Sequence, residues 1–529
     1  MRKLVLHPLL LPIFAVMSLY VHNLGLVPFR DVLVPLLVAV ALSGVLWLLL
    51  SFLVKSKTKS AVIVSAFNLL FFSFVPGGSQ AVGVVCRLQV FGAGCTAAVA
   101  WLWPFLVLFI MGLIVFFVLK AKSELTLVSE FLNLMSVCLV VMMLGRLFYV
   151  RAQSGTASPT LYSRPMRSSG EEIAGGGPLG PLPDIYYIIV DAYARGDILD
   201  QIYDYDNSEF LSYLAEKGFY VAGRARSNYC QTTLSLASSL NSVYLDDLAN
   251  QIGRESTNRR PLGAAIEDNR VFAHLRQHGY KIMVFSGGYS MTELPDADIR
   301  VSPDFALNQF QSKLVNVTPI PLLLRLPFLP SPYDLRRDRI LFTLEHLADP
   351  TGNDGPTFVF AHILAPHQPF VFGPNGEPIE PAGTQVLGLF TLLDSDTDPV
   401  DTYVPQYADQ LSFVSKKLRQ VIDEILSRAS EPPIIIIQAD HGPASTSSRG
   451  STDDSYLRER MSIFSAYYFP DQNYDSLYED ITPVNTFRVV LNQTLGTDYE
   501  MLQDASYYSS YDYPYKFVDV TDQVVSYGD

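Results

Sequence analysis

Five side chains that could bind a metal ion or transfer a proton follow three short apolar segments of this 529-residue sequence. In chain order they are Asp191 after "DIYYIIV", His362 and His367 after "TFVFA", and Asp440 and His441 after "IIIIQA". Short runs rich in β-branched and aromatic residues predict buried strands. In open α/β sheets, ligands bind outside the carboxyl ends of the strands. A lone aspartate there is commonly a turn former, but three such ends together predict a divalent metal site of oxygen and imidazole ligands.

A hydroxyl-rich segment, "SNYCQTTLSLASSLNS" at residues 227–242, offers a reaction partner for such a site. Thr232 and Thr233 stand at the predicted start of a helix. A hydroxyl there lies in the positive field of the helix and near free amide groups, so it suits a nucleophile or a bound phosphate or sulfate. Taken alone, the segment is more typical of an N-cap threonine in a serine-rich helix.

The elements that must position these groups alternate along residues 184–529. Strands are predicted over residues 185–190, 281–285, 357–361, 434–438 and 464–469, and helices over residues 208–217, 232–243, 270–278, 335–348 and 406–428. This alternation predicts a mainly parallel sheet covered by helices on both faces. His274 and His278 lie four residues apart on one predicted helix, and without an accompanying Glu they are expected to form a surface pair.

Apolar runs near the length that crosses a membrane, about twenty residues, recur in the first 150 residues. They cover residues 5–24, 32–54, 61–75, 97–119 and 125–150, and the third is the weakest because Pro76-Gly77-Gly78 ends it early. We therefore expect a transmembrane bundle of about five helices.

Basic residues bias the predicted orientation of this bundle. Those on the proposed inner side are Arg2, Lys3, Lys55, Lys57, Lys59, Lys120 and Lys122, and those opposing it are Arg146, Arg151, Arg164 and Arg167. Since the first spans usually dominate, the N-terminus is predicted to be cytoplasmic and the region after the fifth span extracytoplasmic. The expected location is the cell membrane, with several crossings.

Composition divides the chain into a transmembrane domain at residues 1–152, a Ser/Gly/Pro-rich linker at 153–183 and an extracytoplasmic catalytic domain at 184–529. The formal net charge of −14 splits into +8 before residue 184 and −22 after it. A domain this acidic is not expected to bind nucleic acid. Cys86 and Cys95 share one short predicted loop, where a disulfide is possible and undecided.

The order of these features resembles the alkaline phosphatase/sulfatase superfamily. The resemblance rests on Asp191 after the first strand, Thr232 about forty residues later, the pair His362 and His367, and Asp440-His441-Gly442 after the last long strand. With the apolar runs in front, the chain is most similar to the membrane branch that contains lipoteichoic acid synthases and phosphoethanolamine transferases. An alkaline-phosphatase-like α/β domain is implied for the outer part.

The resemblance also implies residue roles, transferred by position. The metal ligands would be Asp191, Thr232, Asp440 and His441, around one divalent ion whose identity among Mn, Zn and Mg stays open. Thr232 would also be the catalytic nucleophile. His367 would lie near the transferred phosphate as the second catalytic residue, with His362 behind it as a further substrate-binding residue.

Departures from the family pattern narrow the chemistry. The segment "CQTTL" has neither the Pro nor the Arg of the Cys-x-Pro-x-Arg motif of sulfatases, so a formylglycine sulfatase is not expected. No histidine follows His441, whereas two-metal members have one, so a single metal ion is predicted. Arg449, Arg458 and Arg460 are candidates to bind an anionic head group, because guanidinium groups bind phosphate in bidentate fashion; solvated loop arginines would look the same.

Together these features predict a membrane-bound, metal-dependent transferase. It would move a phosphate-linked head group, of phosphoglycerol or phosphoethanolamine type, from a membrane phospholipid to an envelope glycan or glycolipid through a phosphothreonine intermediate. A phosphodiesterase or sulfatase-like hydrolase that uses the same residues is the first alternative. An inactive membrane scaffold of the same fold is the second.

Overall fold

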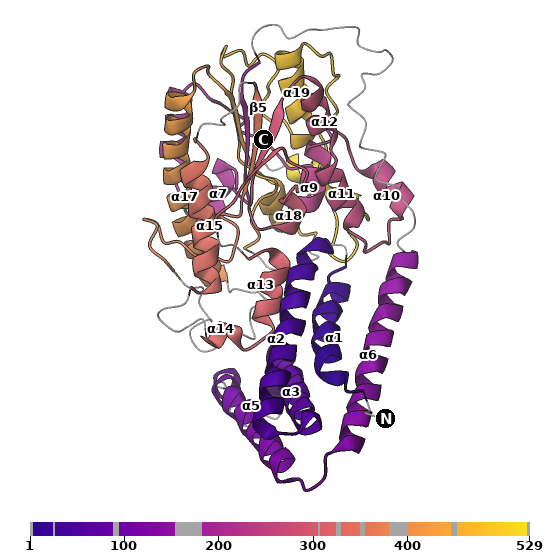
Figure 1. The fold of residues 1–529 in the computed structure, drawn as a ribbon. Helices are drawn as coiled ribbons and strands as arrows, with labels where there is room; N and C mark the ends of the chain where they lie inside the picture. The colour runs from indigo at the N-terminus through magenta and orange to yellow at the C-terminus, as the bar shows by residue number, and fades with distance from the viewer. Residues whose placement is uncertain are drawn as a thin grey trace. The chain divides into compact units, whose positions relative to one another are not determined.

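The computed structural model describes residues 4–24, 27–87, 95–153, 182–304, 307–323, 330–349, 355–379, 400–445 and 452–525 (Figure 1). The chain folds into two compact units. One holds the N-terminal helices together with Leu307–Pro332, and the other holds the sheet with its covering helices. Most of the predicted linker at 153–183 lies outside the described residues.

The helical unit is built from apolar helices. They are α1 (His7–His22), α2 (Arg30–Val54), α3 (Lys57–Phe72), α4 (Phe74–Arg87), α5 (Cys95–Lys120) and α6 (Thr126–Gln153). Among the described residues, α2, α5 and α6 are long and apolar enough to cross a membrane, and α3 with α4 would count as a fourth span bent by 61°. α1 is apolar but has only 16 residues. Each predicted run falls on one of these helices, while the number of crossings and the orientation stay predictions.

The helix break near the end of the third predicted run, residues 61–75, lies earlier than expected, because α3 ends at Phe72 and α4 begins at Phe74. Pro76-Gly77-Gly78 was expected to stop the helix, whereas these residues lie in the first turns of α4. Proline is tolerated in the first turn of a helix, because the N–H that it lacks would have no intrahelical partner there. Cys86, near the end of α4, is disulfide-bonded, while Cys138 and Cys230 are free.

Polar side chains join α1, α2 and α3. Pro12 lies inside α1 and has no N–H, so the carbonyl of Pro8 lacks its helical donor. Ser43 Oγ donates to that carbonyl at 2.6 Å and Asn68 Nδ2 at 3.0 Å. Asn68 Nδ2 also donates to Ser43 Oγ at 2.8 Å. Neighbouring helices thus satisfy the carbonyl that the proline leaves free, as apolar surroundings require.

A segment far along the chain belongs to the helical unit. It contains α13 (Gln309–Asn316) and α14 (Ile320–Leu323). Phe310 is fully buried in a cluster with apolar side chains of the N-terminal helices, namely Val16, Met17, Tyr20, Val21, Val27, Val32 and Met143. Lys313 Nζ donates to Asn23 Oδ1 at 2.7 Å. Sequence patterns did not separate this segment from the α/β domain.

The second unit is built on a seven-stranded sheet in the order β2-β7-β6-β1-β5-β3-β4. The strands are β1 (Ile185–Val190), β2 (Tyr220–Val221), β3 (Lys281–Phe285), β4 (Ile299–Val301), β5 (Thr357–Ile363), β6 (Ile434–Gln438) and β7 (Ser465–Tyr468); β8 (Tyr507–Tyr508) and β9 (Val518–Asp519) form a separate pair. β4, β3, β5, β1 and β6 pair in parallel, and β7 pairs antiparallel with β6 and β2. The predicted fold class, an apolar helical region followed by a mainly parallel α/β domain, is confirmed.

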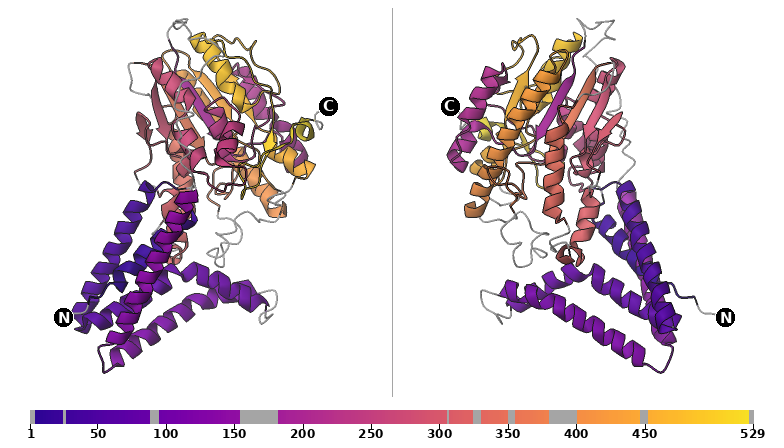
Figure 2. Two further views of the ribbon diagram at one scale, coloured as in Figure 1. Left: turned by 90° about the vertical axis from the view of Figure 1, so that its right-hand side faces the viewer. Right: turned by 60° about the vertical axis from the view of Figure 1, so that its left-hand side comes forward.

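Helices cover both faces of this sheet, as Figures 1 and 2 show. The helices of this unit are α7 (Gly196–Tyr203), α8 (Ser208–Glu216), α9 (Thr232–Ser239), α10 (Asp246–Ile252), α11 (Arg260–Glu267), α12 (Arg270–Gln277), α15 (Pro332–His346), α17 (Val400–Arg428), α18 (Asp454–Met461), α19 (Pro483–Leu495) and α20 (Thr521–Val525). α15 and α17 lie on one face, and α9, α12 and α19 lie on the other (Figure 1). The central strands β1, β5 and β6 are therefore buried throughout.

Two local predictions are wrong. The strand predicted over 357–361 continues to Ile363, so His362 lies inside β5, opposite Ile189 of β1. The expected surface position of His274 is also wrong, because its side chain is only 7% exposed and its ring packs against Tyr499 with centroids 6.0 Å apart. Helical spacing identified the face that His274 shares with His278 but not what covers that face.

Asn68→Ala should destabilise the helical unit through the Pro8 carbonyl. We expect a loss of roughly 1 kcal/mol, as is typical for hydrogen bonds between membrane helices. In a Pro12→Ala background the helix regains its own donor to Pro8, so the same Asn68→Ala change should cost less. Thermal unfolding of the four proteins in detergent measures this cycle. Equal losses in both backgrounds would show that Asn68 acts elsewhere.

Candidate active site

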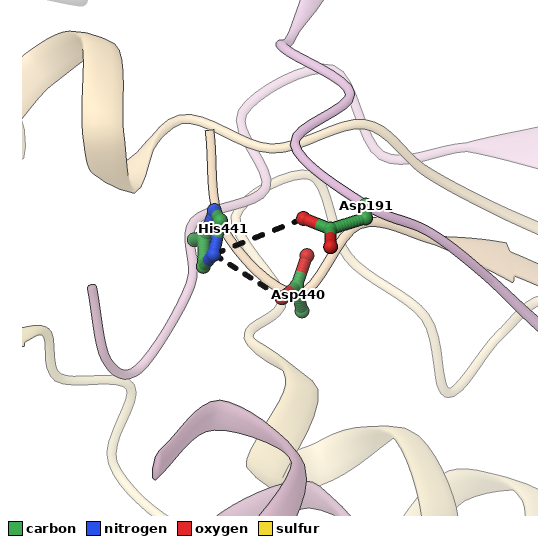
Figure 3. Close-up of side chains that lie close together, drawn as sticks. All are labelled: Asp191, Asp440 and His441. Carbon is green, nitrogen blue, oxygen red and sulfur yellow. Dashed lines mark ion pairs between the residues drawn. The ribbon is translucent and has the colours of Figure 1, made fainter. Parts of the chain in front are cut away.

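The parallel pairing of β1 with β6 brings three predicted metal ligands together. Ile189 lies opposite Gln438, so the chain leaves both strands at the same edge of the sheet. Asp191 follows β1 directly, and Asp440 and His441 follow β6 by two and three residues. Ligand atoms of the three side chains all lie within 4.8 Å of one another (Figure 3).

Thr232 joins this cluster from the first residue of α9. Gln231, at the N-cap, is extended with φ −137° and ψ 138°, so the helix begins at Thr232. Thr232 Oγ1 lies 3.1 Å from His441 Nε2. Since His441 Nδ1 donates to the carbonyl of Gly442 at 3.0 Å, Nε2 carries the ring lone pair and faces the cluster. In that tautomer the single lone pair of Nε2 can accept from one donor or bind a metal ion in the donor's place.

The two carboxylates are in different electrostatic states. Burial raises the pKa of Asp191, but the nearby His367 and His362 outweigh it and hold this pKa well below the usual range. Burial and the charge of Asp191 raise the pKa of Asp440 to about 6. Burial and the neighbouring Arg460 hold the pKa of His441 well below its ordinary value, so its ring is neutral.

The same residues fit a divalent cation. Asp191 Oδ1, Asp440 Oδ2 and His362 Nε2 are buried and have no hydrogen-bond partner. Buried polar atoms in folded proteins are almost always paired with protein, water or an ion. Two carboxylates, a neutral imidazole and a hydroxyl form a donor set that suits such an ion. Asp191, Asp440, His441 and Thr232 could hold it.

The two histidines after β5 occupy different positions. His362 is 1% exposed, with Nε2 at 3.4 Å from Asp191 Oδ2 and Nδ1 at 3.1 Å from Thr292 Oγ1. His367 is partly exposed, and its ring centroid lies 6.1 Å from that of His441. His362 therefore lies behind Asp191, while His367 borders the open side of the cluster.

Of the three predicted arginines, the structure brings one to the site. Arg460 donates from Nη2 to His441 Nε2 at 3.0 Å, from Nη1 to the Gly442 carbonyl at 2.7 Å, and from Nε to the Cys230 carbonyl at 2.8 Å. Arg458 instead pairs with Asp197 at 3.6 Å and bonds Gln201. Arg449 lies outside the described residues.

Sequence reasoning missed Arg259 and Tyr289. Arg259 donates from Nη1 to Thr233 Oγ1 at 3.2 Å and from Nη2 to Gln231 Oε1 at 2.6 Å, so it holds both neighbours of Thr232. Tyr289 packs edge-on against His362 with ring centroids 5.9 Å apart. The loop of Tyr289 follows β3, at the same sheet edge as the other site loops, so the strand-end rule could have identified it. No local signal pointed to Arg259.

A divalent metal should stabilise the wild-type protein and not the Asp440→Asn variant. An ion that binds only the folded state adds about 2.7 kcal/mol at 100 times its Kd. Without metal, Asp440→Asn should be at least as stable as wild type, because it removes one of two adjacent buried carboxylates. Thermal unfolding with metal and with chelator measures both effects.

Asp197→Asn is the matched control, since Asp197 pairs with arginines outside the cluster. It should keep the full response to metal. An undiminished response in Asp440→Asn would show that the ion binds somewhere else.

Gly442→Ala should disturb the same site by a steric route. A Cβ at Gly442 would lie 2.0 Å from the carbonyl oxygen of Glu459, so the segment that carries Asp440 and His441 must shift. We expect a loss of roughly 1–3 kcal/mol in unfolding free energy and a weaker response to metal. Gly355→Ala, where a Cβ would meet nothing within 4 Å, is the control. Identical behaviour of the two variants would contradict the steric account.

No curated protein matches the sequence. Among solved structures, the lipooligosaccharide phosphoethanolamine transferase A (EptA) of Neisseria meningitidis is similar, with 12% identity, a TM-score of 0.42, and 90% of this chain and 89% of that chain covered. The C-terminal periplasmic domain of EcEptC from Escherichia coli shows 10% identity, a TM-score of 0.41, and coverage of 67% and 96%. The phosphonate monoester hydrolase of Agrobacterium radiobacter shows 12% identity, a TM-score of 0.37, and coverage of 62% and 80%.

A family model described as sulfatase matches residues 183–523. This match spans more than half of the chain and includes every residue of the cluster. It confirms the superfamily that the order of Asp191, Thr232 and Asp440-His441-Gly442 predicted. The chain therefore belongs to the sulfatase family.

Proposed function

We propose that this protein is a membrane-bound, metal-dependent transferase. It moves a phosphate-linked head group, of phosphoglycerol or phosphoethanolamine type, from a phospholipid to an extracytoplasmic glycan or glycolipid. The observation that carries the proposal is the position of Thr232 Oγ1, 3.1 Å from His441 Nε2 and beside buried carboxylate oxygens without partners. A hydroxyl held among metal-binding groups is the arrangement that an activated nucleophile needs.

A cation held by Asp191, Asp440, His441 and Thr232 would lower the pKa of the threonine hydroxyl and stabilise charge on the transferred group. Thr232 Oγ1 attacks phosphorus, the phosphorus–oxygen bond to diacylglycerol breaks, and the threonine proton ends on the departing oxygen. The acceptor hydroxyl then attacks the phosphothreonine, and its proton restores the Thr232 hydroxyl. The acceptor and the head group are thereby joined, and the protein is unchanged.

The remaining site residues support this exchange. His367 borders the open side of the cluster and can donate a hydrogen bond to the departing oxygen. Arg460 brings a positive charge between the Cys230 and Gly442 carbonyls, close to both Thr232 and His441, where an anionic group would be attracted. Arg259 holds the residues on either side of Thr232, so the hydroxyl needs little reorganisation before attack.

A lipid donor is favoured by the apolar helices at the start of the chain. Among the described residues, three are long enough to cross a membrane, which would keep the nucleophile close to a bilayer. In the proposed arrangement the protein crosses the cell membrane several times, its N-terminus is cytoplasmic, and the catalytic unit is outside. Hydrolysis is the competing outcome, because Thr232 is partly exposed and water could resolve the phosphothreonine as well.

Exposure to membrane phospholipids should leave a covalent group on Thr232. We expect intact-mass and peptide spectra to show an added phosphoglycerol or phosphoethanolamine on the Thr232 peptide, absent in Thr232→Ala. In Thr233→Ala the group should still form, because that side chain bonds Arg259 and does not face His441. Modification of Thr233, or turnover by Thr232→Ala, would refute the proposed nucleophile.

Head-group-labelled phospholipid in vesicles, together with a glycan or glycolipid acceptor, separates the two reactions. Label on the acceptor is expected for the transferase. Label that appears only in water, whatever acceptor is present, would make the protein a phosphodiesterase.

A further inference from the structure

Arg336, in the first turns of α15, hydrogen-bonds the backbone of the segment that carries His367. Its Nη2 donates to the carbonyl oxygens of Leu364 at 2.5 Å, His367 at 3.1 Å and Gln368 at 3.3 Å. Arg336 Nη2 therefore lies within hydrogen-bond distance of three carbonyl oxygens in residues 364–368. Because these carbonyls precede, include and follow the histidine, the contact fixes the backbone from which its imidazole projects.

The same turn is held from other directions. The backbone N–H of His367 donates to the Asp191 carbonyl at 3.1 Å, and His367 Nδ1 donates to the Gln368 carbonyl at 2.6 Å. Gln410 of α17 donates from Nε2 to the Pro366 carbonyl at 3.0 Å. With Nδ1–H donated to a carbonyl, Nε2 is the ring nitrogen of His367 that remains for a substrate, and it donates a hydrogen bond when it carries the ring's second proton.

Arg336 keeps its charge in this environment. Burial lowers the pKa of Arg336 to about 10; the charge of Asp191 opposes this shift and that of Arg339 adds to it. The guanidinium therefore stays protonated at neutral pH, although its Nε is buried without a hydrogen-bond partner. A buried cation with an unpaired donor costs stability, and such costs are concentrated at functional sites.

We propose that Arg336 is a positioning residue, which holds His367 where it can donate a hydrogen bond to the departing oxygen. The inference rests on the proposed function, in which Thr232 attacks phosphorus and that oxygen takes the threonine proton. Arg336 touches neither the substrate nor the metal ion in this scheme. Its effect passes through the backbone of residues 364–368.

Arg337 provides a matched control on the same helix. Its Nη1 donates to the carbonyls of Ile379 at 3.1 Å and Val371 at 3.5 Å, and its Nη2 bonds Asp334. Both arginines therefore tie carbonyls of the chain after β5 to α15. In the described part of the chain, the hydrogen bonds of Arg336 reach residues 364–368, whereas those of Arg337 reach residues further from His367.

The test compares two probes on the full-length protein in detergent, methyl 4-nitrophenyl phosphate and methyl phenyl phosphate. 4-Nitrophenolate departs readily, whereas the more basic phenolate depends on a hydrogen-bond donor. We expect Arg336→Gln to lower kcat/KM for the phenyl ester about 10- to 100-fold more than for the nitrophenyl ester. Arg336→Lys keeps the charge without the planar fork and should fall between the two. Arg337→Gln should change both values by the same factor.

Equal losses on both esters in Arg336→Gln would overturn the inference, as would a loss confined to KM, which indicates direct substrate binding. If Arg336→Gln does not fold, as judged by thermal unfolding, Arg336→Lys carries the comparison.

Two further variants separate this inference from the proposed function. Activity in Thr232→Ala would refute the proposed function itself, and equal losses on both esters in His367→Gln would refute the role of His367 in it. Selectivity in His367→Gln without selectivity in Arg336→Gln would refute only the role of Arg336.

Discussion

Two carboxylates buried side by side are the constraint on which the α/β unit depends. Asp191 and Asp440 are 4% and 1% exposed, and the charge of each makes ionisation of the other harder. Without compensation, such a pair would take up a proton or force the site open. Imidazole rings around Asp191 favour its charged form, while Asp440 accepts a hydrogen bond from the Ala192 amide at 3.3 Å. Both also have free oxygens for a cation.

Hydrogen bonds at the end of β6 hold the two carboxylates in place. Gln438, the last residue of β6, accepts from Tyr187 at 3.1 Å and donates to Ser465, Tyr467 and Thr486 at 3.0–3.2 Å. Since these partners come from β1, β7 and α19, the end of β6 cannot shift without breaking bonds in three elements. Asp440 follows two residues later.

Hydrogen bonds also fix the turn after β1. Ala192 has φ +64°, a conformation that costs energy for a residue with a Cβ. Tyr407 of α17 compensates, because its hydroxyl donates to the Ala192 carbonyl at 2.8 Å and accepts from the Ala194 amide at 3.1 Å. The direction of Asp191 is thus set by a helix that begins more than 200 residues later in the sequence.

These dependencies explain what the sequence could and could not predict. Apolar runs ending in Asp191 and Asp440 carry local signals, so the strands and the clustering of Asp191, Asp440 and His441 were predictable from pattern and order. Arg336 and Arg259 act through contacts with distant backbone or side chains, and a single sequence has no local signal for such contacts. The burial of Phe310 among the N-terminal helices was hidden for the same reason. Pro76 was interpreted as the end of a helix although it lies in the first turn of α4, because proline is compatible with both positions.

The charge around the site is opposite in sign to the net charge of the α/β domain. The chain after residue 183 carries a net charge of −22, yet guanidinium groups of Arg259, Arg336 and Arg460 lie around the site. Each donates to carbonyl or amide oxygens, which fixes its position without neutralising its charge. A phosphate entering the site would therefore meet positive charge that is already oriented and need not reorganise. The arginines thus make the site suited to an anion, although the rest of the domain is acidic.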